Sequence, residues 1–153
     1  MISYHIMNEE EREMVSAWRY GGDYALYNLP PYKEQKARGV AFGNQARAKN
    51  YCAYYDGDHL IGFTNLSEGE EEVSVGIGVH PNLCGRGYGR LILIQAAAIS
   101  QTLYPGKRLA LEVRTWNQRA IRCYEAAGFQ MDGMPFERIT AVGKGMFYRM
   151  IKV

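Results

Sequence analysis

The chain has 153 residues and a formal net charge of +2, so we expect a single domain over residues 1–153, without the strongly basic surface typical of nucleic-acid-binding proteins. No apolar run reaches the length of a membrane span, and the first residues do not resemble a secretory leader, which predicts a cytoplasmic protein. The three cysteines, Cys52, Cys84 and Cys123, and the three histidines lack metal-ligand spacing, so we expect reduced thiols and no metal site.

The first third of the chain predicts a short strand followed by a helix. Residues 4–6 suit a strand, and Asn8 is a favourable N-cap for a helix that reaches about Trp18. The glutamates at 9–11 support this assignment because acidic side chains are favoured in the first turn of a helix. Next comes an aromatic stretch, residues 18–32, in which Trp18 and four tyrosines are interrupted by Gly-Gly and Pro-Pro breakers.

The middle of the chain predicts antiparallel strands. Strands over residues 51–55 and 60–66 flank an Asp-Gly-Asp turn, which is a hairpin signal. Regular alternation of apolar residues predicts a further strand over residues 73–79. Gly76 and Gly78 leave the other face of that strand bare, so we expect a bulge or the close approach of a ligand there.

Three glycines at alternate positions follow this strand and precede an apolar helical run at 91–99. They are Gly85, Gly87 and Gly89. Glycine lets the backbone approach a ligand closely, and the start of a helix offers unpaired N–H donors at the positive end of its dipole. Strand, glycine loop and helix together predict a binding site for a phosphate-bearing ligand.

The spacing of these glycines excludes two common phosphate motifs. A P-loop requires Lys-Ser or Lys-Thr, which occurs nowhere in the chain. A dinucleotide fingerprint requires glycine at the sixth position, but Arg90 and Ile92 stand there when counted from Gly85 and Gly87. Arg86 and Arg90 can nevertheless add positive charge beside a diphosphate.

The last third predicts a strand, a helix and two more strands. Leucine and valine alternate over residues 109–113, and Asn117 can cap a helix over residues 118–127. Strands are expected near residues 136–141 and 146–151. The order of elements predicts an α+β (mixed α/β) fold with one central, mostly antiparallel sheet of six to seven strands and about four helices.

Two motifs in this order resemble the GNAT superfamily of N-acetyltransferases. The acetyl-CoA motif of that family, Gln/Arg-x-x-Gly-x-Gly/Ala, matches residues 84–89 through Gly87 and Gly89, with Cys84 as a departure at the first position. Residues 111–129 match the second motif, which runs from Leu-Glu-Val through Asn and Ala to Tyr-Glu-x-x-Gly-Phe. The resemblance extends over residues 60–129, and the Leu-Glu-Val-Arg segment is similar to ribosomal-protein alanine acetyltransferases.

The resemblance implies a single GNAT-like domain that uses acetyl-CoA as co-substrate and transfers the acetyl group to a primary amine of a small molecule or peptide. In this family the fourth and fifth strands separate and the pantetheine arm enters between them. Many members are dimers, so a homodimer is also implied. The residues expected to contact acetyl-CoA are Ile77, Val79, Gly85, Arg86, Gly87, Tyr88, Gly89, Arg90, Asn117 and Tyr124.

Three side chains are candidates for catalysis by this resemblance. Tyr124 matches the tyrosine that protonates the departing sulfur, although Tyr124 also fits a core aromatic that shares a helix face with Ile121. Glu112 matches a general base, and it fits equally well a structural carboxylate paired with a cation. Glu72 is the second candidate base, or a solvated residue of an acidic run. Backbone N–H groups near Val79, left free by a bulge, are candidates for stabilising the oxyanion.

Two questions stay open at the level of sequence. The aromatic stretch 18–32 either lines an acceptor pocket, where aromatic faces can hold a cationic amine, or packs a helix on the sheet. The alternative to an enzyme is a non-catalytic acyl-CoA-binding regulatory domain that keeps the same glycine loop. The identity of the acceptor amine is not encoded in either motif.

Overall fold

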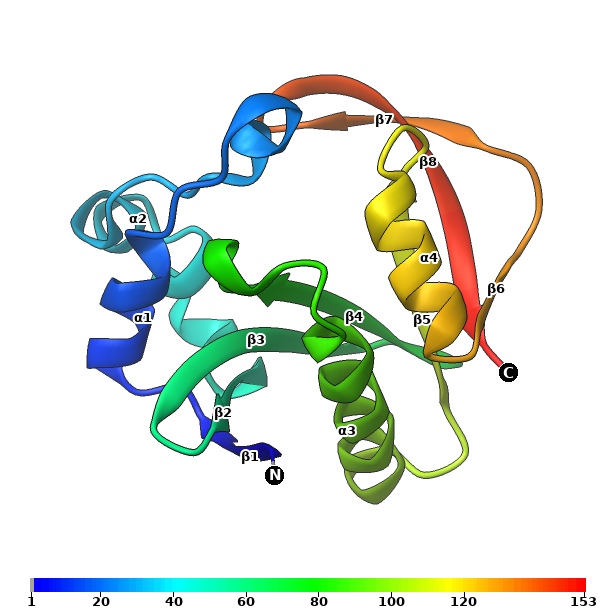
Figure 1. The fold of residues 1–153 in the computed structure, drawn as a ribbon, viewed down its shortest axis with the longest axis horizontal. Coiled ribbons are helices and arrows are strands. Elements are labelled where there is room, and N and C mark those ends of the chain that lie inside the picture. Colours follow the sequence, from blue (N-terminus) through cyan, green and yellow to red (C-terminus); the bar gives the residue numbers. More distant parts are fainter. Residues whose placement is uncertain (1) are drawn as a thin grey trace.

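The computed structural model describes residues 2–153, in which one sheet of eight strands runs in the order β1-β2-β3-β4-β5-β8-β6, with β7 also paired to β8 (Figure 1). The strands are β1 (Ile2–Ile6), β2 (Tyr51–Asp56), β3 (His59–Glu68), β4 (Glu72–Val79), β5 (Arg108–Arg114), β6 (Phe129–Met131), β7 (Phe136–Thr140) and β8 (Gly143–Lys152). All pairs are antiparallel except β4 with β5. The α+β prediction is confirmed, and β6 is a short strand that the sequence pattern did not indicate.

Four α-helices and four short 3₁₀ segments accompany the sheet. The helices are α1 (Glu9–Ser16), α2 (Tyr32–Arg38), α3 (Tyr88–Leu103) and α4 (Gln118–Ala126), and the 3₁₀ segments are η1 (Gly22–Tyr27), η2 (Ala41–Gly43), η3 (Gln45–Asn50) and η4 (Pro81–Leu83). Asn8 caps α1 in a capping box with Glu11, as predicted, but the helix ends at Ser16 rather than near Trp18. No helix in residues 2–153 is long and apolar enough to cross a membrane.

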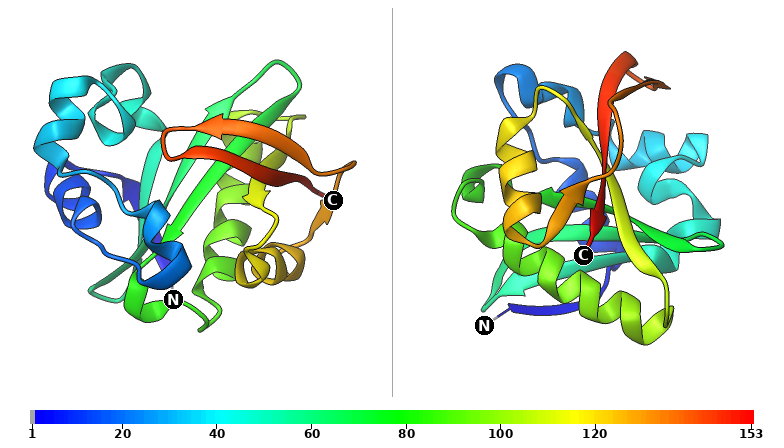
Figure 2. Two further views of the ribbon diagram at one scale, coloured as in Figure 1. Left: turned by 90° about the horizontal axis from the view of Figure 1, so that it is seen from above. Right: turned by 90° about the vertical axis from the view of Figure 1, so that its right-hand side faces the viewer.

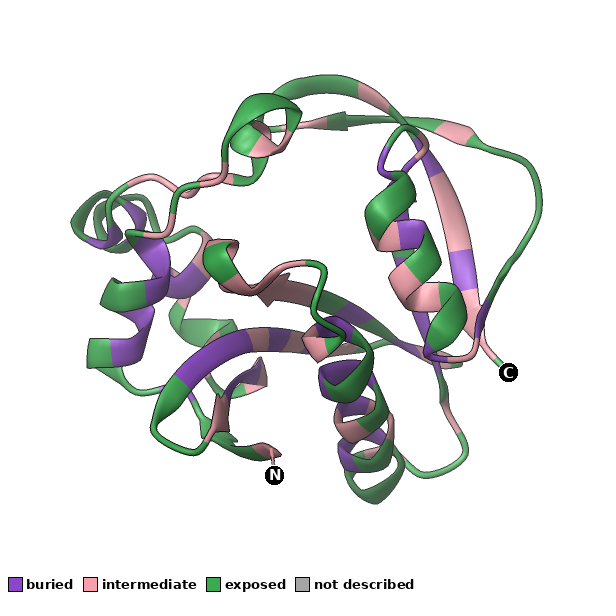
Figure 3. Cartoon of the chain, viewed as in Figure 1, coloured by how far each residue is buried: buried purple, intermediate pink, exposed green. Residues whose placement is uncertain are grey.

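The core is divided between the two faces of the sheet. The larger cluster of buried residues includes Ile92 and Leu93 of α3 and Ile121 of α4, which pack on one face. The smaller cluster includes Val15 of α1 and Tyr32 of α2, on the other side of β2 and β3. Figure 3 shows buried positions interleaved with exposed ones along α1 and α3, as expected for helices that cover a sheet with one side only.

The feature that positions the site is the separation of β4 from β5. These parallel strands pair only at 72–74 and 108–110, and beyond Ser74 and Ala110 they diverge. Figure 2 shows β5 and β8 rising away from the plane of β3 and β4. The separation that the resemblance implied is therefore present, and it leaves one edge of β4 without a partner strand from Val75 onward.

β4 contains no bulge, contrary to one of the two expectations for its glycines. Its register with β3 is constant from Val79 opposite Gly62 to Val73 opposite Glu68. A Cβ on Gly78 would overlap the ring of Phe63, so this glycine is required by side-chain packing across the strand pair. The N–H groups expected to be freed by a bulge are instead exposed by the departure of β5.

The direction of the β4 peptide groups follows from one hydrogen bond. The N–H of His80 donates to the carbonyl of Ile61 at 2.8 Å, so the peptide groups of even-numbered residues face β3. Because peptide groups alternate along a strand, those of Val75, Ile77 and Val79 face the gap between β4 and β5. This orientation places main-chain donors of Ile77 and Val79 along one wall of the gap.

Candidate active site

A cleft of about 720 Å³ occupies the space between the separated strands. Residues 75–79 of β4 and 111–114 of β5 form its two walls, and the loop at 83–90, α4 and the aromatic stretch near η1 complete it. This volume lies within the usual range for small-molecule sites. The cleft brings the two sequence motifs together, because the glycine loop follows one wall and α4 follows the other.

Each glycine of the loop has its own structural reason. Gly85 and Gly87 have φ values of +80° and +84°, which side chains of L-residues rarely adopt. Gly87 is the N-cap of α3 and no side chain caps this helix, so its first-turn N–H groups stay available to an anion. A Cβ on Gly89 would lie 2.6 Å from the Sγ atom of Cys123, so Gly89 allows α3 and α4 to approach each other.

The polar side chains of the loop point in different directions. Arg90 lines the cleft, and its Nε donates to the carbonyl of Ala126 at 3.2 Å. Arg86 and Tyr88 instead line a second depression, and the Tyr88 hydroxyl donates to Oδ2 of Asp56 at 2.7 Å. The side chains of Arg86 and Tyr88, both expected to contact acetyl-CoA, therefore do not line the cleft. The backbone N–H of Tyr88, at the first position of α3, remains as its group that can contact the ligand.

Tyr124 of α4 lines the cleft. Its ring lies 6.4 Å from that of Phe129, so it also packs against the core as an aromatic residue. No group in the described part of the chain forms a hydrogen bond with its hydroxyl. Burial raises the pKa of this phenol, so Tyr124 stays protonated throughout the neutral range.

Asn117 connects the start of α4 to the aromatic stretch. Its Oδ1 accepts the N–H of Ala120 at 3.1 Å, which confirms the predicted N-cap. Its Nδ2 donates to the hydroxyl of Tyr27 at 3.1 Å. Asn117 lines the cleft, but both ends of its amide already have protein partners.

The two candidate bases have different surroundings. Glu112 lines the cleft and faces away from the buried Leu111 and Val113, as strand alternation predicts, while accepting a bond from Nη2 of Arg138 at 2.5 Å. Glu72 does not line the cleft. It lies where β4 and β5 are still paired and binds both terminal nitrogens of Arg149 at 2.5 Å. The geometry thus favours Glu112 over Glu72 as a group that can reach an acceptor amine.

The ion pair of Glu72 predicts a pH-dependent contribution to stability. Its hydrogen bonds from Arg149 lower the pKa of Glu72, so the carboxylate stabilises the fold above its unfolded-state pKa of about 4.3 and loses this effect as the pH falls through the lower folded-state pKa. Glu72→Gln should therefore cost about 1 kcal/mol in urea unfolding at pH 7 and less at about pH 3. Glu71→Gln, next to it in the exposed acidic turn, is the matched control. An equal loss at both pH values would contradict this role.

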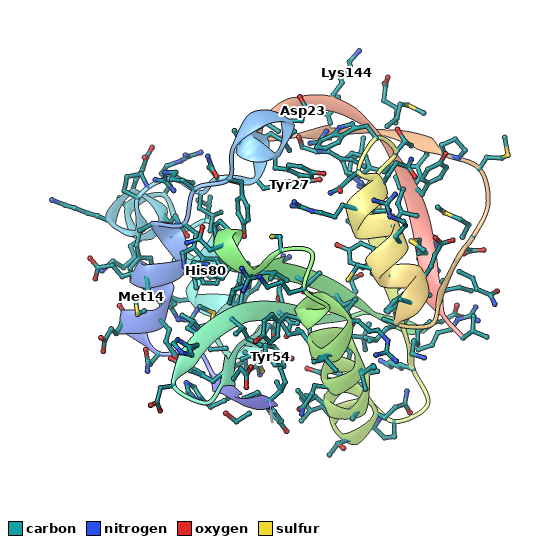
Figure 4. The ribbon with its side chains drawn as sticks, viewed as in Figure 1. Met14, Asp23, Tyr27, Tyr54, His80 and Lys144 are labelled. Atoms are coloured by element: carbon teal, nitrogen blue, oxygen red, sulfur yellow. The ribbon has the colours of Figure 1, made fainter. Side chains whose placement is uncertain are left out.

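The aromatic stretch combines both expected roles: Tyr32 packs α2 in the smaller core cluster, whereas the middle part of the stretch lines the cleft. The hydroxyl of Tyr20 donates to the carbonyl of Val79 on β4 at 2.7 Å. On the other wall, the rings of Tyr24 and Tyr27 lie 5.6 and 6.2 Å from that of Trp116, and Figure 4 shows Tyr27 directed toward α4. Tyr20, Tyr24 and Tyr27 all line the cleft, so this stretch connects its two walls.

Three arginines that line the cleft were not indicated by the sequence motifs. They are Arg114, Arg119 and Arg122. Strand alternation could have placed Arg114 on the same face as Glu112, and helical spacing could have placed Arg119 and Arg122 on one side of α4. Neither pattern reveals a cleft, because the separation of β4 from β5 is needed before these side chains share a space.

The profile of the acetyltransferase (GNAT) family matches residues 5–129. Since this match covers most of the 153 residues, the chain belongs to the GNAT family and is an N-acetyltransferase. Enzymes of this family use acetyl-CoA as the donor. Among curated protein sequences, none matches this chain.

Solved structures with the same fold are distant in sequence. A spermidine N-acetyltransferase from Vibrio cholerae, in complex with CoA and spermine, has a TM-score of 0.77 at 16% identity, over 98% of this chain and 94% of that one. The ribosomal-protein-S18-alanine N-acetyltransferase from Escherichia coli has a TM-score of 0.67 at 18% identity, over 99% and 93%. At these identities the similarity establishes the fold.

Proposed function

We propose that residues 1–153 form one catalytic domain that transfers the acetyl group of acetyl-CoA directly to a primary amine of a small molecule or peptide. The observation that carries this proposal is that the glycine loop and Tyr124 line one cleft between β4 and β5. A single sheet that includes strands from both ends of the chain supports the domain assignment. The expectations of a homodimer, of a cytoplasmic location and of no nucleic-acid or membrane partner stay predictions.

The chain offers a series of contacts suited to acetyl-CoA. The backbone N–H groups at 85–90 and the side chain of Arg90 hold the diphosphate at the start of α3. The peptide groups of Ile77 and the N–H of Val79 face the gap, where Ile77 pairs with an amide group of the pantetheine arm and Val79 contacts the acetyl group. The bound CoA of the Vibrio cholerae enzyme supports a site of this kind in a fold that this chain shares.

The chemistry requires three groups, and the cleft supplies one for each. An acceptor amine with a pKa of about 10.4 is mostly protonated at neutral pH, and Glu112 receives its proton directly or through a water molecule. The N–H of Val79 donates to the oxygen that becomes negatively charged during attack. Tyr124 donates its proton to the departing sulfur, since its hydroxyl is both free and protonated.

Thiol release from acetyl-CoA in the presence of a panel of primary amines tests this function. Glu112→Gln should lower kcat by about 10- to 100-fold at pH 7, and the deficit should shrink toward pH 10, where the amine loses its proton without a base. A purely structural role for Glu112 would instead give a deficit that is the same at every pH. Glu137→Gln, at an exposed position of β7, is the control.

The alternative of a non-catalytic acyl-CoA sensor predicts another outcome of the same experiment. Tight binding of acetyl-CoA in calorimetry, together with no thiol release on any amine, would support the sensor. If acetyl-CoA did not bind at all, the account of the glycine loop would also be wrong.

A further inference from the structure

Arg114 is a buried cation on the wall of the cleft. It is the last residue of β5, it is only 8% exposed, and its guanidinium lies 4.8 Å from the centre of the Phe147 ring. Its Nη2 donates to Oγ1 of Thr140 at 3.2 Å. Gly145 makes room for it, because a Cβ at that position would overlap the guanidinium. The surrounding strands are thus shaped to hold this side chain in place.

No carboxylate in residues 2–153 forms an ion pair with Arg114. Burying a guanidinium is costly unless an opposite charge or several acceptors compensate it, and one hydroxyl and one aromatic ring compensate it only in part. The other buried arginine of comparable exposure, Arg12, donates to two main-chain carbonyls and does not line the cleft. Arg12 has no carboxylate partner in residues 2–153 either, and its Nη1 has no hydrogen-bond partner there, so what distinguishes Arg114 is that it lines the cleft, where a ligand can reach it.

The charged side chains that line the cleft also favour an anionic ligand. Four arginines and a single glutamate line it among the described residues. The glutamate, Glu112, is already paired with Arg138, and the guanidinium of Arg119 lies 4.0 Å from the centre of the Tyr24 ring. Arg90 is assigned to the diphosphate of acetyl-CoA, and the other three arginines still outnumber the one glutamate, so the cleft attracts an anionic group more than a polycation such as a polyamine.

We propose that the acceptor is an amine that also carries a carboxylate, and that Arg114 binds this carboxylate and so determines specificity. This inference rests on the proposed acetyl transfer. A guanidinium binds a carboxylate through two parallel hydrogen bonds, which suits a buried and preformed site. Glu112 and Arg114 are two positions apart on one face of β5, so their Cα atoms are about 6.5 Å apart. The acceptor class that fits both groups is a short amino acid.

The test compares matched acceptors by thiol release from acetyl-CoA. The panel contains the proteinogenic amino acids, β-alanine and 4-aminobutyrate, each beside its carboxamide, together with 1,4-diaminobutane as an amine without an acidic group. For wild type, kcat/KM should be about 10- to 100-fold higher for the best acid than for its carboxamide, as expected for charge-assisted hydrogen bonds. Arg114→Met should bring this ratio close to one by lowering the rate on the acid only.

Matched variants separate specificity from folding. Arg108→Met removes an exposed arginine from the start of the same strand and should leave the ratio unchanged. Arg114→Lys keeps the charge but loses the paired geometry, so it should retain part of the preference. Acetyl-CoA affinity, measured by calorimetry for each variant, should equal that of wild type. If Arg114→Met does not fold, the wild-type ratio and Arg114→Lys still decide the question.

Each outcome has a distinct meaning. Equal wild-type rates on acids and carboxamides, or a preference for 1,4-diaminobutane, would overturn the role of Arg114 while leaving the acetyltransferase intact. Acetyl-CoA binding with no turnover on any acid of the panel would also overturn it. Failure to bind acetyl-CoA would show instead that the proposed function itself is wrong.

Discussion

Tyr124→Phe is expected to lower kcat by at least about 100-fold while acetyl-CoA affinity changes by less than about twofold. The substitution removes one hydroxyl, which has no protein partner, and keeps the ring that packs near Phe129. Loss of a general acid therefore affects the departure of the sulfur without disturbing the core. Thiol release under saturating acetyl-CoA measures the first effect, and calorimetry measures the second.

The pH profile provides a second measurement of the same role. A general acid acts only when protonated, and burial raises the pKa of Tyr124 above its ordinary value of about 10. Activity of the wild type should therefore show no loss attributable to this group up to about pH 10. Tyr104→Phe, in a half-buried tyrosine packed on the same core but outside the cleft, is the control. Turnover of Tyr124→Phe at the wild-type rate would refute the acid role.

Gly87→Glu is expected to weaken acetyl-CoA binding by at least about 100-fold. Two effects add at this position. The φ angle of +84° is unfavourable for any residue with a Cβ, by roughly 1–2 kcal/mol. The carboxylate would also stand at the start of α3, where we place the diphosphate, and would repel it. The measurement is calorimetric titration with acetyl-CoA.

Two variants separate these effects. Gly87→Ala introduces only the backbone strain and should reduce affinity less. Gly106→Glu carries the same side chain at a glycine with the same φ of +84°, in a turn outside the cleft, so it should bind acetyl-CoA like wild type. If Gly87→Glu bound acetyl-CoA with wild-type affinity, the loop would not be the binding site of the diphosphate.

Features that depend on neighbours in the chain were predictable. Asn8 and Asn117 cap their helices because a side-chain oxygen reaches N–H groups only three residues away. Alternation along β5 placed Glu112 opposite to Leu111 and Val113, since side chains of a strand alternate between faces. The family motifs at 84–89 and 111–129 likewise consist of near neighbours.

Features that depend on distant partners were not predictable. The helix α2 and the three-residue strand β6 have short sequences without a clear period, and packing determines them. Glu72 stood in an acidic run, and only the fold places Arg149, 77 residues later, within hydrogen-bonding distance. The aromatic stretch had two possible roles in sequence, and only the fold shows that Tyr20 and Tyr24 line the cleft whereas Tyr32 packs in the core.

The sequence by itself determined the family, the order of the strands and helices other than α2 and β6, and the glycine loop at the start of α3, because each depends on residues a few positions apart. Only the tertiary structure decided that β4 and β5 part after Ser74, and hence which charged side chains meet in the cleft. The physical reason is that strand pairing depends on packing against partners that are distant in the sequence, which no local pattern encodes. Arg114 illustrates this, since its partners come from β7 and β8.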